Sequence, residues 1–215
     1  MLKTDYKREV ENTLKILADR VDEALIEGKG KEVIPIIESE IKSLVGIDLE
    51  LLNTLSFESA TEIISRENQY NFLKYIALGE ALKLMGIVYF SINEDSKGLY
   101  YYEKASEAFF EADAEEDIES EYHKSIEIIL DKLSDYELEI SYEKIIFRLY
   151  QIIGYYDKAE DMLFSILKKT SNNKEIIDLG INFYNALLEK SDKELEKGNL
   201  PREEIAESKH YIEEL

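Results

Sequence analysis

Apolar residues recur three and four positions apart along almost the whole chain, and this periodicity constrains the fold more than any other feature. The alternation of apolar and polar residues that is typical of strands is nowhere sustained. Two prolines and nine glycines among 215 residues leave long stretches in which nothing interrupts a helix. The sequence therefore predicts an all-α fold of antiparallel helical hairpins without a sheet.

Glycines and short polar turns divide this pattern into helices. Gly28 and Gly30 are expected to end the first helix, because glycine readily adopts the left-handed conformation of a helix C-cap. Pro35 is tolerated only in the first turn of its helix. Asp113 opens a segment that resembles a capping box, so a helix is expected to start there. The predicted helices cover about residues 5–27, 33–44, 49–55, 57–65, 68–91, 97–112, 115–133, 136–153, 155–169 and 174–197, and a last one ends near residue 214.

The character of the helices changes near Arg66–Asn68, where short helices give way to longer hairpins. This change predicts an N-terminal helical segment over residues 1–66 and a hairpin region over residues 67–215. A chain of 215 residues suits one domain or two small ones, and we expect the two regions to form one continuous unit.

Two stretches carry small and aromatic residues at offsets that resemble the tetratricopeptide repeat (TPR), a pair of packed helices. In a frame that starts at Gly79, such residues occupy signature positions in both helices of the pair. They are Gly86, Tyr89, Gly98, Tyr102 and Ala105. The two glycines are expected to permit close approach of the helices, and the two tyrosines to fill the space beside them.

A second frame starts at Ile140, and its segment 154–159 resembles the G-x-Y-x-x-A turn between the helices of a TPR unit. Gly154, Tyr156 and Ala159 hold the signature positions of that turn, whereas Phe147 stands where the family has a small residue. The family's proline is missing, and the predicted helix 115–133 separates the two frames. The resemblance implies a degenerate TPR-like right-handed superhelix; the alternative is a generic helical bundle.

The whole chain also resembles a group of bacterial TPR-like proteins of unknown function, which implies a fold and no activity. The resemblance rests on three segments. These are Asp5-Tyr6…Arg8…Glu11, Leu44…Gly46-Ile47-Asp48-Leu49…Leu52…Leu55-Ser56, and Gly154-Tyr155…Lys158-Ala159-Glu160-Asp161-Met162-Leu163-Phe164.

The charge balance restricts the partners of this protein. The chain has 26 basic and 47 acidic residues, a net charge of −21. Such a field repels phosphate backbones and anionic lipids, so we expect neither nucleic-acid nor membrane binding, and it attracts cationic partners. Cysteine is absent, and the opening segment leads directly into a charged helix without a signal peptide. We therefore expect a cytoplasmic protein.

No group of residues in the sequence indicates catalysis, so we expect no enzyme, no cofactor and no metal. His123 lies between Glu119 and Glu127 at helical spacing, but an acidic helix usually carries such a stripe as a solvated face. His210 with Glu207 forms only half of a di-iron helix pattern. Phosphate-binding glycine loops and the G-x-S-x-G motif are also missing.

By analogy with the family, one face of each first helix would line a partner-binding groove. The candidate residues are Lys83, Ile87, Phe90, Lys144, Arg148 and Gln151. Lys144 and Arg148 stand one turn apart, a spacing at which two cations can chelate one carboxylate; the alternative is an ordinary surface pair. The acidic segment Glu107–Glu121 is either a docking site for a basic partner or cation, or a helix start whose acids complement the helix dipole.

Helix 5–27 carries a long apolar stripe, formed by Tyr6, Val10, Leu14, Leu17, Val21 and Ala24. Because the helices that follow are short, they would leave part of this stripe uncovered, which predicts a homodimer through helix 5–27. The alternative is a monomer that folds the helix onto its own core. The most consistent function is a protein–protein interaction or scaffold role with an unknown partner protein or peptide. The alternative is a sensor of a small ligand or peptide.

Overall fold

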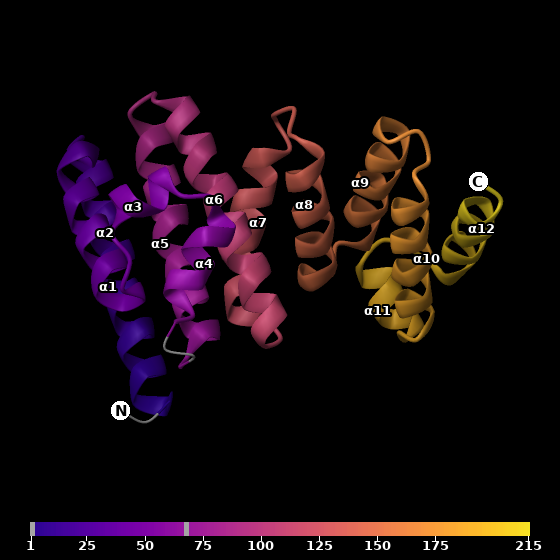
Figure 1. Ribbon diagram of the computed structural model, residues 1–215, viewed down its shortest axis with the longest axis horizontal. Coiled ribbons are helices and arrows are strands. Elements are labelled where there is room, and N and C mark those ends of the chain that lie inside the picture. The colour runs from indigo at the N-terminus through magenta and orange to yellow at the C-terminus, as the bar shows by residue number, and fades with distance from the viewer. Residues whose placement is uncertain (1–2, 67–68) are drawn as a thin grey trace. The chain divides into compact units, whose positions relative to one another are not determined.

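The computed structural model describes residues 3–66 and 69–215, and within them every regular element is a helix (Figure 1). This confirms the predicted all-α fold. The described residues separate into two compact units, one ending at Leu133 and the other covering Ser134–Leu215. The boundary that the sequence suggested near residue 66 falls inside the first unit, and residues 67 and 68 beside it lie outside the described part. The right-handed TPR-like superhelix stays a prediction.

The first unit is built around α5, which packs against α1, α2, α6 and α7. Buried apolar residues cover most of the circumference of α5, as expected of a helix at the centre of a core. The elements of this unit are α1 (Lys3–Ile26), α2 (Gly30–Val45), α3 (Leu49–Thr54), α4 (Phe57–Ile64), α5 (Asn71–Ser91), α6 (Asp95–Glu115), the 3-10 helix η1 (Ser120–Tyr122) and α7 (His123–Leu133).

The apolar stripe of α1 is buried inside the first unit. Val10, Leu17 and Val21 are at most 1% exposed, and α1 packs on both α2 and α5. The Tyr6 hydroxyl also donates a hydrogen bond of 2.6 Å to the Leu44 carbonyl. The expectation that neighbouring helices would leave the stripe uncovered is therefore wrong, because α5 completes the cover. A homodimer stays a prediction, but this stripe is not its surface.

The hairpin of α5 and α6 is the tightest contact of the first unit. A Cβ at Gly86 would lie 2.2 Å from the Tyr102 ring, and one at Gly98 would lie 2.8 Å from the Phe90 ring. The two glycines thus leave room for two aromatic rings between the helices. Tyr89 stacks on Tyr101 at 5.3 Å between ring centroids, and Ala105 is fully buried.

The second unit consists of α8 (Ile140–Ile153), α9 (Tyr156–Lys169), α10 (Lys174–Leu188), α11 (Asp192–Lys197) and α12 (Arg202–Glu213). Gly154 caps α8 with a φ of 79°, and Ala159 is fully buried. Tyr156 packs on Gly198, where a Cβ would lie 2.3 Å from its ring. The predicted turn between α8 and α9 is present, and the end of α11 covers it.

Two predicted helix boundaries are wrong. The helix expected at residues 115–133 starts only at His123, because α6 continues past the buried Ala112 and Asp113–Glu115 form its last turn. The helix expected at residues 174–197 breaks after Leu188. Ser191 restarts the chain as α11 with a capping box, in which its side chain and that of Glu194 each bind the other's backbone N–H.

The start of α2 also differs from the prediction. The helix begins at Gly30, so Pro35 lies beyond its first turn. Gly30 takes part in the helix instead of capping the previous one, and a Cβ there would lie 3.2 Å from Leu25. Pro35 is exposed, so its ring points away from the core and the helix tolerates its missing N–H.

None of the helices in the described residues is both long and apolar enough to cross a lipid bilayer.

Candidate functional site

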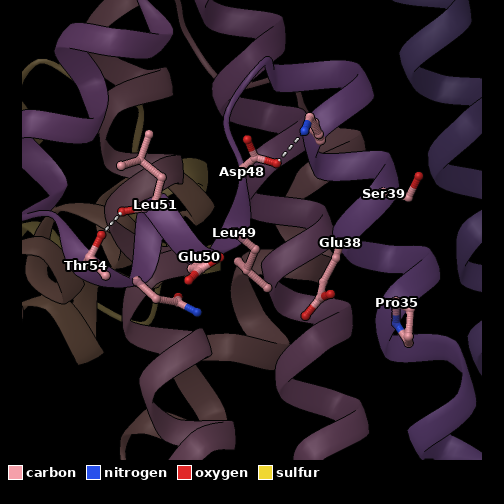
Figure 2. Close-up of a pocket in the computed structure, with 10 residues that line it drawn as sticks. Pro35, Glu38, Ser39, Asp48, Leu49, Glu50, Leu51 and Thr54 are labelled. Atoms are coloured by element: carbon pink, nitrogen blue, oxygen red, sulfur yellow. Dashed lines mark hydrogen bonds and ion pairs between the residues drawn. The ribbon is translucent and has the colours of Figure 1, made fainter.

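The surface of the first unit has a large open groove between α2 and α3, with a volume of about 1020 Å³ (Figure 2). One wall is the polar face of α2 and the other is α3 with the turn before it. The groove is lined by Pro35, Glu38, Ser39, Lys42, Asp48, Leu49, Glu50, Leu51, Asn53 and Thr54.

Local sequence explains why these side chains meet. On α2 the lining residues are three, four and seven positions apart, so they share a face opposite the buried Ile37 and Ile41. Gly46 then ends α2 with a φ of 83°, a conformation that suits glycine. Ile47 is 1% exposed and anchors the turn. The chain therefore folds back and sets α3 beside the polar face of α2.

The groove has an excess of negative charge. Lys42 pairs with Asp48 at 2.7 Å and joins the end of α2 to the start of α3. Glu38 and Glu50 are exposed and have no ion-pair partner among the described residues. In the view of Figure 2 their carboxylates lie on either side of Leu49. Two uncompensated carboxylates therefore face the groove from opposite walls.

Apolar and aromatic groups accompany these carboxylates. Leu51 is 40% exposed, one of the few large apolar side chains left open to solvent. Asn53 donates a hydrogen bond of 3.3 Å to the Tyr101 hydroxyl and accepts one of 3.4 Å from Tyr100. Burial raises the pKa of Tyr101, and the nearby Glu38 carboxylate adds to the rise. Asn53, at the edge of the groove, thus links α3 to two tyrosines of α6.

A second hollow, smaller and apolar, lies where α5, α6 and α7 meet. Its volume is about 460 Å³. It is lined by Ile87, Phe90, Tyr102, Ile128, Asp131 and Lys132. Phe90 and Tyr102 meet edge to face at 5.2 Å between ring centroids. The Lys132 ammonium lies 4.9 Å from the centroid of the Phe90 ring, within cation–π distance. We refer to this site as the apolar hollow.

The groove residues predicted on α5 are partly covered by α7. Lys83 pairs with Glu80 at 2.6 Å and donates a hydrogen bond of 2.7 Å to the Ser125 hydroxyl of α7. Its side chain is only 11% exposed. Ile87 and Phe90 stay accessible and line the apolar hollow. The structure therefore brings two of these three residues together at a surface hollow and uses the third to join two helices.

The residues predicted on α8 belong to the second unit. Lys144 pairs with Glu175 at the start of α10, at 2.7 Å. The Gln151 side chain donates a hydrogen bond of 3.1 Å to the Phe147 carbonyl. Arg148 is exposed on the same helix. Because Lys144 already has a carboxylate partner, the structure does not support the two-cation clamp.

The acidic segment Glu107–Glu121 finds cations within the first unit. Lys104 pairs with Glu107 at 2.9 Å, and Lys7 pairs with Glu119 at 2.7 Å. The Lys7 hydrogen bond holds the pKa of Glu119 below its ordinary value. The acids from Glu107 to Glu115 lie within α6 and do not complement the start of a helix. Glu119 and Glu121 do stand at a helix start, because Glu119 precedes η1 and η1 leads directly into α7. Lysines of the first unit also neutralise part of the segment.

Sequence reasoning missed the groove between α2 and α3. The available signal was the run of exposed polar positions on one face of α2, followed by the Gly46-Ile47-Asp48 turn. Among the described residues, no group of three or more histidines or carboxylates gathers in a way that could hold a metal ion. His210 instead lies 3.4 Å from Glu214 on the exposed face of α12.

A comparison with known protein families finds one family model that matches residues 1–215, described as a family of unknown function (DUF6483). No curated protein and no solved structure matches the chain. The family match covers the whole chain and assigns no activity to either hollow, so a function has to be argued from the geometry.

Proposed function

Because the chain belongs to DUF6483, a family of unknown function, we propose from geometry alone that it is a protein-interaction or scaffold protein. The groove between α2 and α3 binds a basic segment of its partner. The observation that carries this proposal is the pair of opposed carboxylates, Glu38 and Glu50, which have no ion-pair partner among the described residues. An adjacent exposed leucine offers the apolar contact that a specific interface needs.

The net charge of −21 supports the same assignment at longer range. A field of this sign accelerates the approach of a cationic partner, while local carboxylate pairs determine where that partner docks. A basic segment with cationic side chains for Glu38 and Glu50 and an apolar side chain for Leu51 would use all three features. The half-buried Tyr100, which is hydrogen-bonded to Asn53, also offers aromatic surface on which a guanidinium can stack.

Short fluorescein-labelled peptides provide the test. One peptide carries lysine or arginine at every third or fourth position around a leucine, and its matched partner carries glutamate at those positions. When the protein is titrated into each peptide, we expect a saturable rise in fluorescence anisotropy for the basic peptide and none for the acidic one. The affinity for the basic peptide should fall as salt is added. Equal binding of the two peptides would contradict the proposal.

A charge-reversal pair then separates the groove from the general field. The variant Glu38→Lys with Glu50→Lys should weaken binding of the basic peptide by about tenfold or more. The control variant, Glu9→Lys with Glu62→Lys, changes the net charge equally at exposed positions outside the groove. It should weaken binding by less than about threefold. If both variants weaken binding equally, the net charge alone attracts the peptide and the groove has no special role.

A further inference from the structure

An open furrow lies between α1 and α2 on their solvent-facing side, at one edge of the first unit (Figure 1). Its apolar residues are Ala24 and Ile36, which are half-buried, and Val33, which is buried. Ile16 stands four positions before Arg20 of the furrow, on the same face of α1, and is 55% exposed. Folding of the chain therefore leaves an isoleucine of each helix open to solvent on one side of the pair.

The charged groups of the furrow have both signs. Lys29 pairs with Glu27 at 2.7 Å, and these two charges compensate each other. Arg20, Glu23 and Glu32 are exposed and have no ion-pair partner among the described residues. One cation and two carboxylates therefore remain available to a partner.

This mixture of charges restricts the class of partner. Arg20 would repel a basic surface, and the carboxylates of Glu23 and Glu32 would repel an acidic one. A second copy of the chain, related to the first by a twofold axis, offers its own arginine to these carboxylates and receives Arg20 in return. Each attractive pair then forms twice, as in any symmetric dimer. The charges of the furrow are thus complementary to themselves.

The net charge of −21 opposes association of two copies, but little of it lies on the helix in question. α1 has five basic and six acidic residues, so its own net charge is −1. Charges elsewhere on the molecule are screened beyond about 8 Å at physiological ionic strength. Two copies can therefore approach each other through α1 with little local repulsion.

The area of this side of the molecule is sufficient for a dimer. With 24 and 16 residues, α1 and α2 are about 36 Å and 24 Å long and each about 10 Å across. Together they offer roughly 600 Å² to a partner. Specific complexes bury about 600–1,000 Å² on each side, so the interface would lie at the lower end of that range.

We propose that the furrow between α1 and α2 joins two copies of this chain in a symmetric dimer. Arg20 of each protomer pairs with Glu23 or Glu32 of its partner, and the side chains of Ile16 and Ile36 form the apolar centre. This surface is distinct from the buried stripe of α1. No residue lines both the furrow and the groove between α2 and α3, so either proposal can fail without the other.

Sedimentation equilibrium of the full chain provides the first test. The monomer has a mass of 25.0 kDa. We expect the average mass to rise towards twice this value as the protein concentration increases from about 1 to about 100 μM. A monomer mass over this whole range would overturn the proposal.

Charge reversal then identifies the surface. Arg20→Glu makes the free charges of the furrow wholly acidic and should weaken dimerisation by about tenfold or more. Glu23→Arg with Glu32→Arg makes them wholly basic and should weaken it as much, although this variant lowers the net negative charge of the chain. An equimolar mixture of the two variants should dimerise again, because every pair between the protomers then has opposite charges.

Arg8→Glu is the matched control, because Arg8 is exposed on α1 and does not line the furrow. It should change the dissociation constant by less than about threefold. All the substituted positions are exposed, so each variant is expected to fold, and melting temperatures check this. A mixture that stays monomeric, or equal effects of Arg20→Glu and Arg8→Glu, would overturn the proposal.

Discussion

The hairpin α5/α6 of the first unit and the hairpin α8/α9 of the second carry the same kind of helix-pair signature but pack in different ways. In the first, Gly86 and Gly98 lie within the pair and hold the rings of Tyr102 and Phe90 between the two helices. In the second, Phe147 occupies the small position, and its ring meets Phe183 of α10 at 5.2 Å between centroids.

The close glycine contacts of the second unit lie outside its hairpin. A Cβ at Gly180 of α10 would be 3.0 Å from Leu163 of α9 and from Ile212 of α12. Gly198 performs a similar role beside Tyr156. The two hairpins therefore share an apolar periodicity that specifies where their helices lie along the chain. The positions of the glycines determine which pair of helices in each unit approaches most closely.

The largest effect is expected for Gly86→Val in the first unit. The new side chain would meet the Tyr102 ring, whose Cδ1 atom already lies 2.2 Å from where a Cβ would stand. A buried aromatic ring cannot move aside easily, so we expect a loss of about 3 kcal/mol or more in the free energy of unfolding. Urea denaturation measures this loss, and hydrogen exchange should show faster exchange in α5 and α6 than in α8 and α9.

The companion variant adds Tyr102→Ala to Gly86→Val. If the ring is the cause of the strain, removing it should recover part of the lost stability, and the two substitutions should not be additive. Full additivity would show that the hairpin α5/α6 does not depend on this contact.

A smaller effect is expected for Ala159→Leu in the second unit. Ala159 is fully buried, so a larger side chain overpacks its surroundings at a cost of about 2 kcal/mol. Ala186→Leu is the control, because Ala186 is exposed on α10. Urea denaturation of both variants provides the measurement. Similar stability of the two would mean that α9 does not use its alanine for close packing.

The next effect concerns a buried polar contact of the second unit. The Tyr184 hydroxyl donates a hydrogen bond of 2.7 Å to the carboxylate of Glu160. Tyr184→Phe removes the donor and leaves the carboxylate less satisfied, at an expected cost of about 1–2 kcal/mol at pH 7. Chemical denaturation at pH 7 measures it, and an unchanged midpoint would contradict the importance of this bond.

The same contact predicts how stability depends on pH. Burial raises the pKa of Glu160 above its ordinary value of 4.5, against the hydrogen bonds from Tyr184 and Ser208, which lower it. Because the folded pKa is the higher one, this group's contribution to stability is complete below pH 4.5 and is lost as the pH rises through the folded pKa. We expect Glu160→Gln to be more stable than the wild type at pH 7. Acidification should stabilise the wild type as Glu160 becomes protonated, whereas the variant should lack this stabilisation. Denaturation at several pH values measures both effects.

The smallest effect is expected for Gly180→Ala, which tests a close glycine contact of the second unit. Its Cβ would meet only the ends of flexible side chains, from Ile212 and Leu163, at 3.0 Å. A small adjustment is therefore inexpensive, and alanine favours a helix over glycine by about 1 kcal/mol. Thermal and urea unfolding should show a change of less than about 1 kcal/mol in either direction. A loss as large as that of Gly86→Val would make the two glycines equivalent.

Much of the fold was predictable because helix formation depends on local spacing. The apolar stripe of α1, the turn at Gly154 and the hairpin α5/α6 all follow from residues close to one another in sequence. The break between α10 and α11 was also encoded, as Ser191-x-x-Glu194, but the continuing apolar spacing on both sides concealed it. The boundary between α6 and α7 was misplaced because acidic residues usually favour the start of a helix and here stand at its end.

The candidate sites were predictable only in part. Ile87 and Phe90 were expected to share a face because they are three positions apart on one helix, and they do line one hollow. Their neighbours Ile128 and Lys132 come from α7, and the spacing within α5 contains no information about that helix. The groove between α2 and α3 could not be predicted for the same reason. In the sequence Glu38 is an ordinary solvent-exposed position of a helix, and it becomes part of a groove only because α3 lies beside it.

The sequence by itself determined that this protein is helical, where most of its turns fall and which face of each helix is apolar. These properties depend on periodicity, glycine and capping, which act over a few residues. Tertiary structure alone decided that α5 lies at the centre of its unit and that α7 covers Lys83. It also decided that two carboxylates from different helices face one groove. The physical reason is that burial and charge compensation depend on contacts between residues far apart in the chain, and local spacing does not specify them.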